Sequence, residues 1–172
     1  MRGARLRDIA FRDARGTSVG LPAVAEPTIR RSLFRILKQN PLCSIATVTA
    51  RDRPHISTAY FSYSNDLVLY FLSHPDAQHC RNLARNPSVG VTIFSSVQPW
   101  GSPGQGVQLF GTCRRATGLH LRQAERVYGR RFPAYGTWRA SGPTRGWEGR
   151  GPARYSVGSD LAVSAVSGFV PV

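Results

Sequence analysis

Lysine and acidic side chains are scarce in this sequence. Lys38 is the only lysine among 23 Lys and Arg residues, and Asp and Glu together number 9, which gives a formal net charge of +14. A basic protein attracts polyanions, so nucleic-acid binding is a function class that the charge leaves open. The arginines are spread over the N-terminal segment, the first predicted helix and residues 113–154 instead of one run. We therefore do not expect nucleic acid to be the main partner.

Long apolar runs and paired cysteines are also missing. No segment approaches the ~18 consecutive apolar residues that a membrane helix needs, and the opening MRGARLRDIAFRDARG lacks the apolar core of a secretory signal. Cys43, Cys80 and Cys113 form no CxxC pair, and their odd number is typical of reduced, buried thiols. No GxSxG or HExxH hydrolase motif occurs. We expect a cytoplasmic protein with no membrane association and no metal site.

The length of 172 residues suits one domain with a substantial core. Residues 1–25 lack sustained periodicity, and we interpret them as a flexible basic N-terminal arm. Residues 26–172 are predicted to form a single domain. A helix is predicted to open at Glu26–Pro27–Thr28 and to end at Asn40–Pro41, because apolar residues recur at helical spacing between them.

Strand patterns dominate the rest of the chain. Residues 42–50, 54–63 and 67–73 are β-rich and joined by short turns, which predicts an antiparallel meander. Residues 88–96 and 106–116 predict two further strands, and the C-terminal segment from residue 153 predicts one or two more. A helix is predicted at residues 118–133 and a loop at 134–151. The chain is therefore predicted to be mainly β, a small antiparallel barrel with helical additions.

The stretch FLSHPDAQHCRNLARNP, residues 71–87, predicts a strand that ends at Ser73 and a helix that starts near Pro75. A helix start presents unpaired backbone N–H groups, which suit a phosphate, and Ser73, His74, Gln78 and His79 stand around it. The alternative is an ordinary capped turn, with Ser73 or His74 as the N-cap and Asp76 in the first turn. One residue can serve both purposes, so the sequence leaves both interpretations open.

The order of these motifs resembles the pyridoxamine-phosphate-oxidase-like, FMN-binding split-barrel family. The resemblance rests on IATVTARDRPHISTAYFSY, LVLYFLSHPDAQHCRNLARNPSVGVTIF and GVQLFGTCRRA, and covers about residues 28–132. The combination GVQLFG…RVYGRRFP looks closest to a small bacterial branch of that family. The resemblance implies a six-stranded antiparallel split β-barrel of FMN-binding type and a homodimer with two flavin sites between its subunits. FMN is the usual cofactor, but relatives bind the deazaflavin F420 or haem.

The resemblance also implies which residues contact the cofactor. The residues around the helix start would hold the phosphate, the strand with His55, Ser57 and Thr58 would run beside the flavin, and Trp100 and Gln108 would flank its ring. One position departs from the pattern: flavin-binding relatives commonly carry Lys or Arg where this chain has His79, which is only partly charged near neutral pH. That difference implies a weaker phosphate site or a different ligand. No catalytic residue is predicted.

Three functions remain open on the sequence. The first is a flavin-dependent oxidoreductase that transfers a hydride or two electrons to or from a small organic substrate. The second is a non-flavin member of the fold that binds haem or a small metabolite, with His55, His74, His79, His120 or Cys80 as candidate axial ligands. The third is a basic nucleic-acid-binding protein. The basic row Arg122, Arg126 and Arg130 is interpreted as a solvated helix face or as a patch for an acidic partner.

Overall fold

Strands make up most of the described elements. The computed structural model describes residues 11–12, 18–19, 26–101, 104–140, 153–157 and 162–167. The strands are β1 (Phe11–Arg12), β2 (Ser18–Val19), β3 (Leu42–Val48), β4 (Pro54–Tyr63), β5 (Leu69–Ser73), β6 (Ser88–Phe94), β7 (Gln105–Arg115), β8 (Ala153–Val157) and β9 (Ala162–Ser167). The helices are α1 (Glu26–Gln39), α2 (Gln78–Arg85), α3 (Gly118–Arg131) and α4 (Ala134–Ala140). The predicted mainly-β class with helical additions is confirmed.

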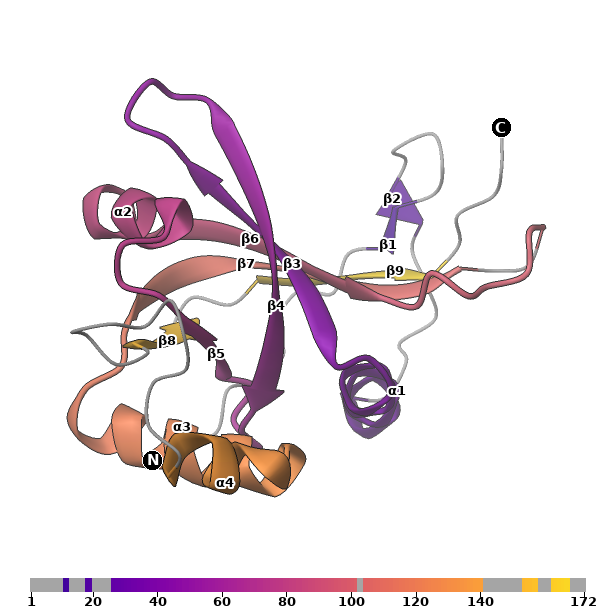
Figure 1. The fold of residues 1–172 in the computed structure, drawn as a ribbon. Helices are drawn as coiled ribbons and strands as arrows, with labels where there is room; N and C mark the ends of the chain where they lie inside the picture. Colours follow the sequence, from indigo (N-terminus) through magenta and orange to yellow (C-terminus); the bar gives the residue numbers. More distant parts are fainter. Residues whose placement is uncertain are drawn as a thin grey trace.

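Every strand pair in the described part of the chain is antiparallel. β3, β4 and β5 are neighbours in chain order, so the predicted meander is confirmed. β5 pairs with β8, β8 with β7, β7 with β6, and β6 returns to β3. The sheet therefore curls back on itself, and β9 extends it along β7 (Figure 1). β1 and β2 pair with each other, and most of the predicted N-terminal arm lies outside the described residues.

Alternation along the strands separates an inner face from an outer face. On β3, Cys43, Ile45 and Thr47 are buried, whereas Leu42 and Ala46 are exposed, as the period of two along a strand requires. The inner face and the helices facing it form one core. Its largest fully buried apolar side chains are Tyr70, Phe61, Phe71, Leu37, Ile45, Leu69, Ile93, Leu109 and Val107.

Helices α1 and α2 lie at opposite ends of the strands (Figure 1). The apolar spacing predicted for α1 is confirmed, because Leu33 and Leu37 enter the core. Helix α2 contributes Cys80 and Leu83 at the other end. Burial keeps the cysteines inert: all three are free and buried, and removal from water raises the pKa of the Cys43 and Cys113 thiols to about 12.

Arg131 fastens α3 to the end of α1. Its Nη2 atom donates hydrogen bonds to the carbonyl oxygens of Leu37 and Asn40, each at 2.7 Å. The guanidinium also lies over the ring of Phe61, 4.5 Å from its centroid. A cation beside the last carbonyls of a helix complements its dipole. Arg131 therefore has a structural role.

The loop predicted at residues 134–151 is wrong in part, because Ala134–Ala140 is the helix α4. Gly and Pro in this region favoured a loop, but tertiary packing overrides that preference. The buried Tyr135 ring lies 5.1 Å from the Tyr128 ring, and its hydroxyl donates to Glu125 Oε2 at 3.0 Å. Residues 141–151 lie outside the described part. None of the described helices has the length and apolar composition needed to cross a membrane.

Candidate functional site

A buried amide seats α2 on the strands beneath it. Asn82 is only 2% exposed; its Nδ2 atom donates to Thr47 Oγ1 at 3.0 Å and its Oδ1 atom accepts from Gln78 Nε2 at 2.8 Å. Thr47 in turn donates to the backbone carbonyl of His55 at 3.3 Å. A buried amide must be bonded in this way, because leaving it unpaired costs about 1–3 kcal/mol. The network fixes α2 against the β3–β4 hairpin.

The first turn of α2 has no side-chain cap. The predicted start near Pro75 is wrong: the helix begins at Gln78, with Ala77 at the N-cap position and no side-chain hydrogen bond there. Residues 74–77 form a turn instead, closed by the bond from Ala77 N to His74 O at 3.0 Å. The capping alternative for Ser73 is therefore wrong as well. An uncapped start leaves backbone N–H groups directed away from the helix, the arrangement that favours anions.

Ser73 and His79 meet beside this helix start. The Ser73 hydroxyl, on a residue that is 7% exposed, shares a hydrogen bond of 2.5 Å with His79 Nε2. The His79 ring is half-buried between the rings of Phe71 and His55, with centroid distances of 6.1 and 6.4 Å. Burial, and secondarily the neighbouring His55, lowers the pKa of His79 below its ordinary value of 6.5. Near neutral pH this pair is therefore polar but uncharged.

His55 and Ser57 project from the inner side of β4, as the strand alternation predicts. His55 pairs across the ladder with Thr47, and Ser57 with Ile45. Within the described part of the chain, the buried His55 Nδ1 and Ser57 Oγ atoms have no hydrogen-bond partner. Buried polar atoms are nearly always bonded, so two orphans on one strand face call for a ligand or water.

His74 and Gln78 are engaged within the chain. His74 Nδ1 accepts a hydrogen bond from the Asp76 backbone at 3.2 Å and lies 3.9 Å from that carboxylate. The Gln78 amide donates to Asn82 and accepts from Arg81 Nη2 at 2.7 Å. The other Arg81 nitrogen donates to the Asp76 carbonyl. Arg81 is thus the cation of this first turn.

Thr58 and Gln108 lie on the outer face of the sheet, away from α2. They belong to one cross-strand row, in which Thr58 pairs with Ser44, Ser44 with Thr92, and Thr92 with Gln108. Sequence reasoning did not select Ser44 or Thr92, because hydroxyl residues are common in strands and only the register places them beside Thr58 and Gln108. It also missed Asn82, whose place in RNLxxNP was the only available signal.

Trp100 and Gln108 line one apolar groove at the edge of that face. The groove has a volume of about 570 Å³, and its walls include Phe94, Gly106 and Val107. The Trp100 side chain is 87% exposed in the single chain. The nine predicted cofactor residues therefore fall into two groups. His55, Ser57, Ser73, His74, Gln78 and His79 lie inside the barrel or at its α2 end. Thr58, Gln108 and Trp100 lie outside it.

The structure is a curled antiparallel barrel with a polar helix start at one end, and this combination identifies a class of split-barrel proteins. The family model for pyridoxamine 5'-phosphate oxidase matches residues 29–151, most of the chain. The chain belongs to this family, and the predicted resemblance is confirmed. No curated protein matches the sequence.

Solved structures share the fold at low sequence identity. HutZ, the haem storage protein of Vibrio cholerae, is 18% identical with a TM-score of 0.62, covering 85% of this chain and 98% of HutZ. A haem-binding protein of Mycobacterium smegmatis is 16% identical with a TM-score of 0.62, covering 83% of this chain and 60% of that one. A protein of unknown function from Agrobacterium tumefaciens is 16% identical with a TM-score of 0.61. The match covers 89% of this chain and 63% of the Agrobacterium protein, so this chain spans less than two thirds of that protein's length.

The lowered pKa of His79 predicts an acid-sensitive contribution to stability. At pH values well above 6.5 the histidine is neutral in both the folded and the unfolded chain. As the pH falls below 6.5, the unfolded chain binds the proton first, so the free energy of unfolding decreases until the lower folded pKa is passed. The loss amounts to about 1.4 kcal/mol for each unit that separates the two pKa values.

Urea unfolding at pH 7.5 and pH 5.0 measures this contribution. We expect His79→Gln to lose less stability between these pH values than the unmodified protein. His120→Gln, which changes an exposed histidine of α3, serves as the control for replacing a histidine by glutamine. Equal losses in all three proteins would contradict the assigned environment of His79.

Proposed function

We propose that the protein is a homodimeric FMN-binding member of the family, whose split barrel comprises the six strands β3 to β8. Its chemistry is a two-electron or hydride transfer between the flavin and a small organic substrate. The observation that carries the proposal is the uncapped start of α2 beside the Ser73–His79 pair. A helix start with an adjacent hydroxyl and imidazole is suited to a phosphate monoester.

The donor set fits a phosphate tail but supplies little charge. Because His79 is neutral near pH 7, the positive contribution comes from the helix dipole and from Arg81. The exposed Asp76 carboxylate in the preceding turn opposes it. We therefore infer an exchangeable cofactor instead of a permanently bound one. The same donors would also accept the phosphate of F420.

The orphaned atoms of β4 support a polar ligand next to the phosphate site. His55 Nδ1 and Ser57 Oγ are buried without partners in the described part, although His55 lies against His79. Hydroxyl groups of a ribityl chain would satisfy both a histidine nitrogen and a serine oxygen. The bond energy recovered is about 1 kcal/mol for each group.

The flavin ring requires a second surface, which the α2 end of one chain does not provide. The groove lined by Trp100, Phe94 and Gln108 offers an aromatic side chain for stacking and an amide for the ring heteroatoms. We infer that the α2 end of one protomer and this groove of its partner form one composite cleft. Bound FMN would supply the electron-accepting ring, while the chain would hold its two ends and exclude water.

The outer sheet face is suited to pairing with a second copy. Exposed apolar side chains gather on β3, β4, β6 and β7, among them Ile56 at 69% and Phe110 at 52% exposure. The outward positions of these strands, from Leu42 to Thr112, carry no charged residue. In a chain with a formal charge of +14, such a face allows two identical copies to meet without like-charge repulsion.

Haem is the second candidate, because two structures with the same fold are described as haem proteins. Cys80 is only 3% exposed within the core and is unsuited as an axial ligand. His120 is exposed on α3, with its Nδ1 atom 3.5 Å from the Tyr70 hydroxyl. A Soret band in the spectrum of the purified protein, without flavin absorbance, would favour this candidate over FMN.

Binding of FMN and riboflavin distinguishes a phosphate-anchored flavin from other ligands. We expect FMN to bind about tenfold more tightly than riboflavin, a difference of about 1.4 kcal/mol that reflects the phosphate contacts. His79→Ala and Ser73→Ala should weaken FMN binding about 3- to 10-fold and leave riboflavin binding unchanged. Flavin fluorescence titration measures both ligands, with His120→Ala as the matched control. Equal affinities for FMN and riboflavin, or no binding of either, would refute the proposed phosphate site.

Charge placed on the outer face should separate the subunits. Phe110 lies over Gly90, with ring carbons 3.6 and 3.7 Å from the position that a Cβ there would take. Phe110→Glu would bury two carboxylates in the proposed interface, so we expect sedimentation to show a dimer for the unmodified protein and a monomer for the variant. Leu119→Glu, at an exposed apolar residue of α3, should remain dimeric. An unmodified protein that sediments as a monomer with and without FMN would contradict the composite cleft.

A further inference from the structure

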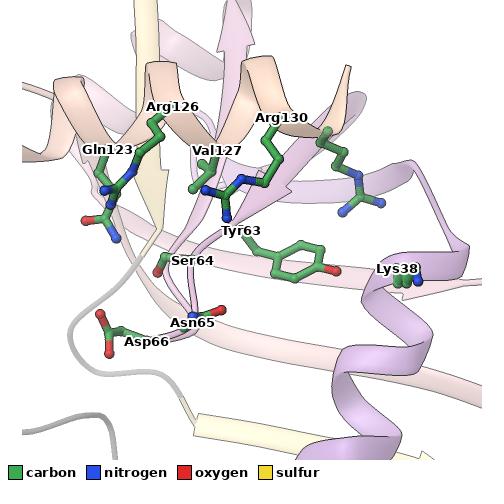
Figure 2. A pocket seen from close by; sticks show the side chains of 10 residues that line it. Lys38, Tyr63, Ser64, Asn65, Asp66, Gln123, Arg126, Val127 and Arg130 are labelled. Atoms are coloured by element: carbon green, nitrogen blue, oxygen red, sulfur yellow. The ribbon is translucent and has the colours of Figure 1, made fainter. Parts of the chain in front are cut away.

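A basic cavity lies at the opposite end of β4 from the proposed phosphate site. It has a volume of about 660 Å³, and it is enclosed by the end of α1, the β4–β5 turn and one side of α3 (Figure 2). Tyr63, at the end of β4, forms part of its wall. His55 and Tyr63 are eight residues apart on one strand, a separation of roughly 26 Å at about 3.3 Å per residue. The cavity is therefore separate from the α2 end of the same chain.

Cations converge on this cavity from two helices. Arg126 and Arg130 come from successive turns of α3, and Lys38 comes from the last turn of α1 (Figure 2). Within the described part of the chain, none of the three has a hydrogen-bond or ion-pair partner, and the ion pairs there are His74–Asp76 and Arg139–Glu125. Like charges at positions i and i+4 of a helix destabilise it. A bound anion would reverse that effect.

The charge balance of the cavity is strongly positive. Among the described residues, Lys38, Arg126, Arg130 and Arg131 line it together with a single carboxylate, that of Asp66. Arg131 donates through Nη2 to the carbonyls at the end of α1, whereas its buried Nη1 atom has no hydrogen-bond partner in the described part of the chain. The residue thus holds the wall and strengthens the local positive potential. The wall is therefore preorganised, while the other three cations are available for binding.

Uncharged donors complete the lining. In Figure 2 the Tyr63 hydroxyl points toward Lys38, and the Arg130 guanidinium lies toward the Tyr63 ring. Gln123 adds a side-chain amide beside Arg126, and Asn65 adds another from the turn that carries Ser64 and Asp66. Arginine forks, a lysine and a phenol hydroxyl together form a donor set suited to the oxygens of phosphate groups.

We propose that this cavity binds a small phosphate-bearing molecule that carries two or more negative charges. The concave shape and the volume, within the range of about 300–1,000 Å³ for small-molecule sites, favour a compact ligand over a nucleic-acid strand. Arg122 belongs to the same basic row of α3, yet it does not line the cavity. The row is thus divided into two cavity residues and one solvated residue, a division that neither sequence interpretation of the row predicted.

Calorimetric titration with inorganic pyrophosphate at fixed ionic strength tests the site. We expect saturable binding with one site per chain, and at least a tenfold loss of affinity in the double variant Arg126→Gln/Arg130→Gln. Arg122→Gln removes the same charge from the same helix outside the cavity and should change the affinity less than twofold. Acetate, a monoanion, should not compete. All three arginines are exposed, so thermal melting should confirm that every variant folds.

Three results would overturn the proposal. One is an absence of pyrophosphate binding. Another is an equal loss of affinity in Arg122→Gln and the double variant, which would show attraction to net charge alone. The last is a single-stranded RNA oligomer that binds more tightly than pyrophosphate with the same dependence on Arg126 and Arg130. FMN titration of the double variant keeps the two sites distinguishable, since FMN affinity should be unchanged there.

Discussion

The hydrogen bonds of the buried Asn82 amide are the constraint on which the proposed flavin site depends. Asn82 joins α2 to Thr47 of β3 and, through it, to the backbone of His55 on β4. Helix α2 is thereby held in a fixed position against β3 and β4, so that His79 contacts Ser73 and faces His55. A buried amide tolerates no alternative position without losing its partners. The precision of the site thus comes from a residue that contacts no proposed ligand.

Charge is distributed so that each surface suits a different purpose. The outer face of β3, β4, β6 and of β7 as far as Thr112 carries no charged residue, which permits contact between identical copies. The α2 end relies on backbone dipoles and a neutral histidine, which permits a phosphate to bind and leave. The cavity beside α3 concentrates arginine and lysine. The positive charge of the chain is therefore distributed unevenly: it is high at the cavity beside α3 and low on the outer sheet face and at the α2 end.

Periodic sequence patterns predicted the strands and helix ends that depend on neighbouring residues. They did not predict the features that depend on contacts between residues far apart in the chain. Alternation placed β3 to β7 and put His55 and Ser57 on one face of their strand, and Asn–Pro pairs located the ends of α1 and α2. Helix α4 was missed because it is stabilised by Tyr135 packing against α3. The start of α2 was misplaced because Pro75 and Asp76 imitate a first turn. The row from Thr58 to Gln108 depends on register across four strands, which no single-strand pattern contains.

The most direct test of the central claim is the ³¹P NMR signal of FMN in the presence of excess protein. If the phosphate lies at the start of α2, its resonance should be displaced from that of free FMN, and its titration between pH 5 and pH 8 should be shifted to lower pH, because the helix start favours the dianion. The His79→Ala variant should show a smaller displacement. A phosphate resonance that keeps the position and titration of free FMN, while the flavin fluorescence reports binding, would contradict the account.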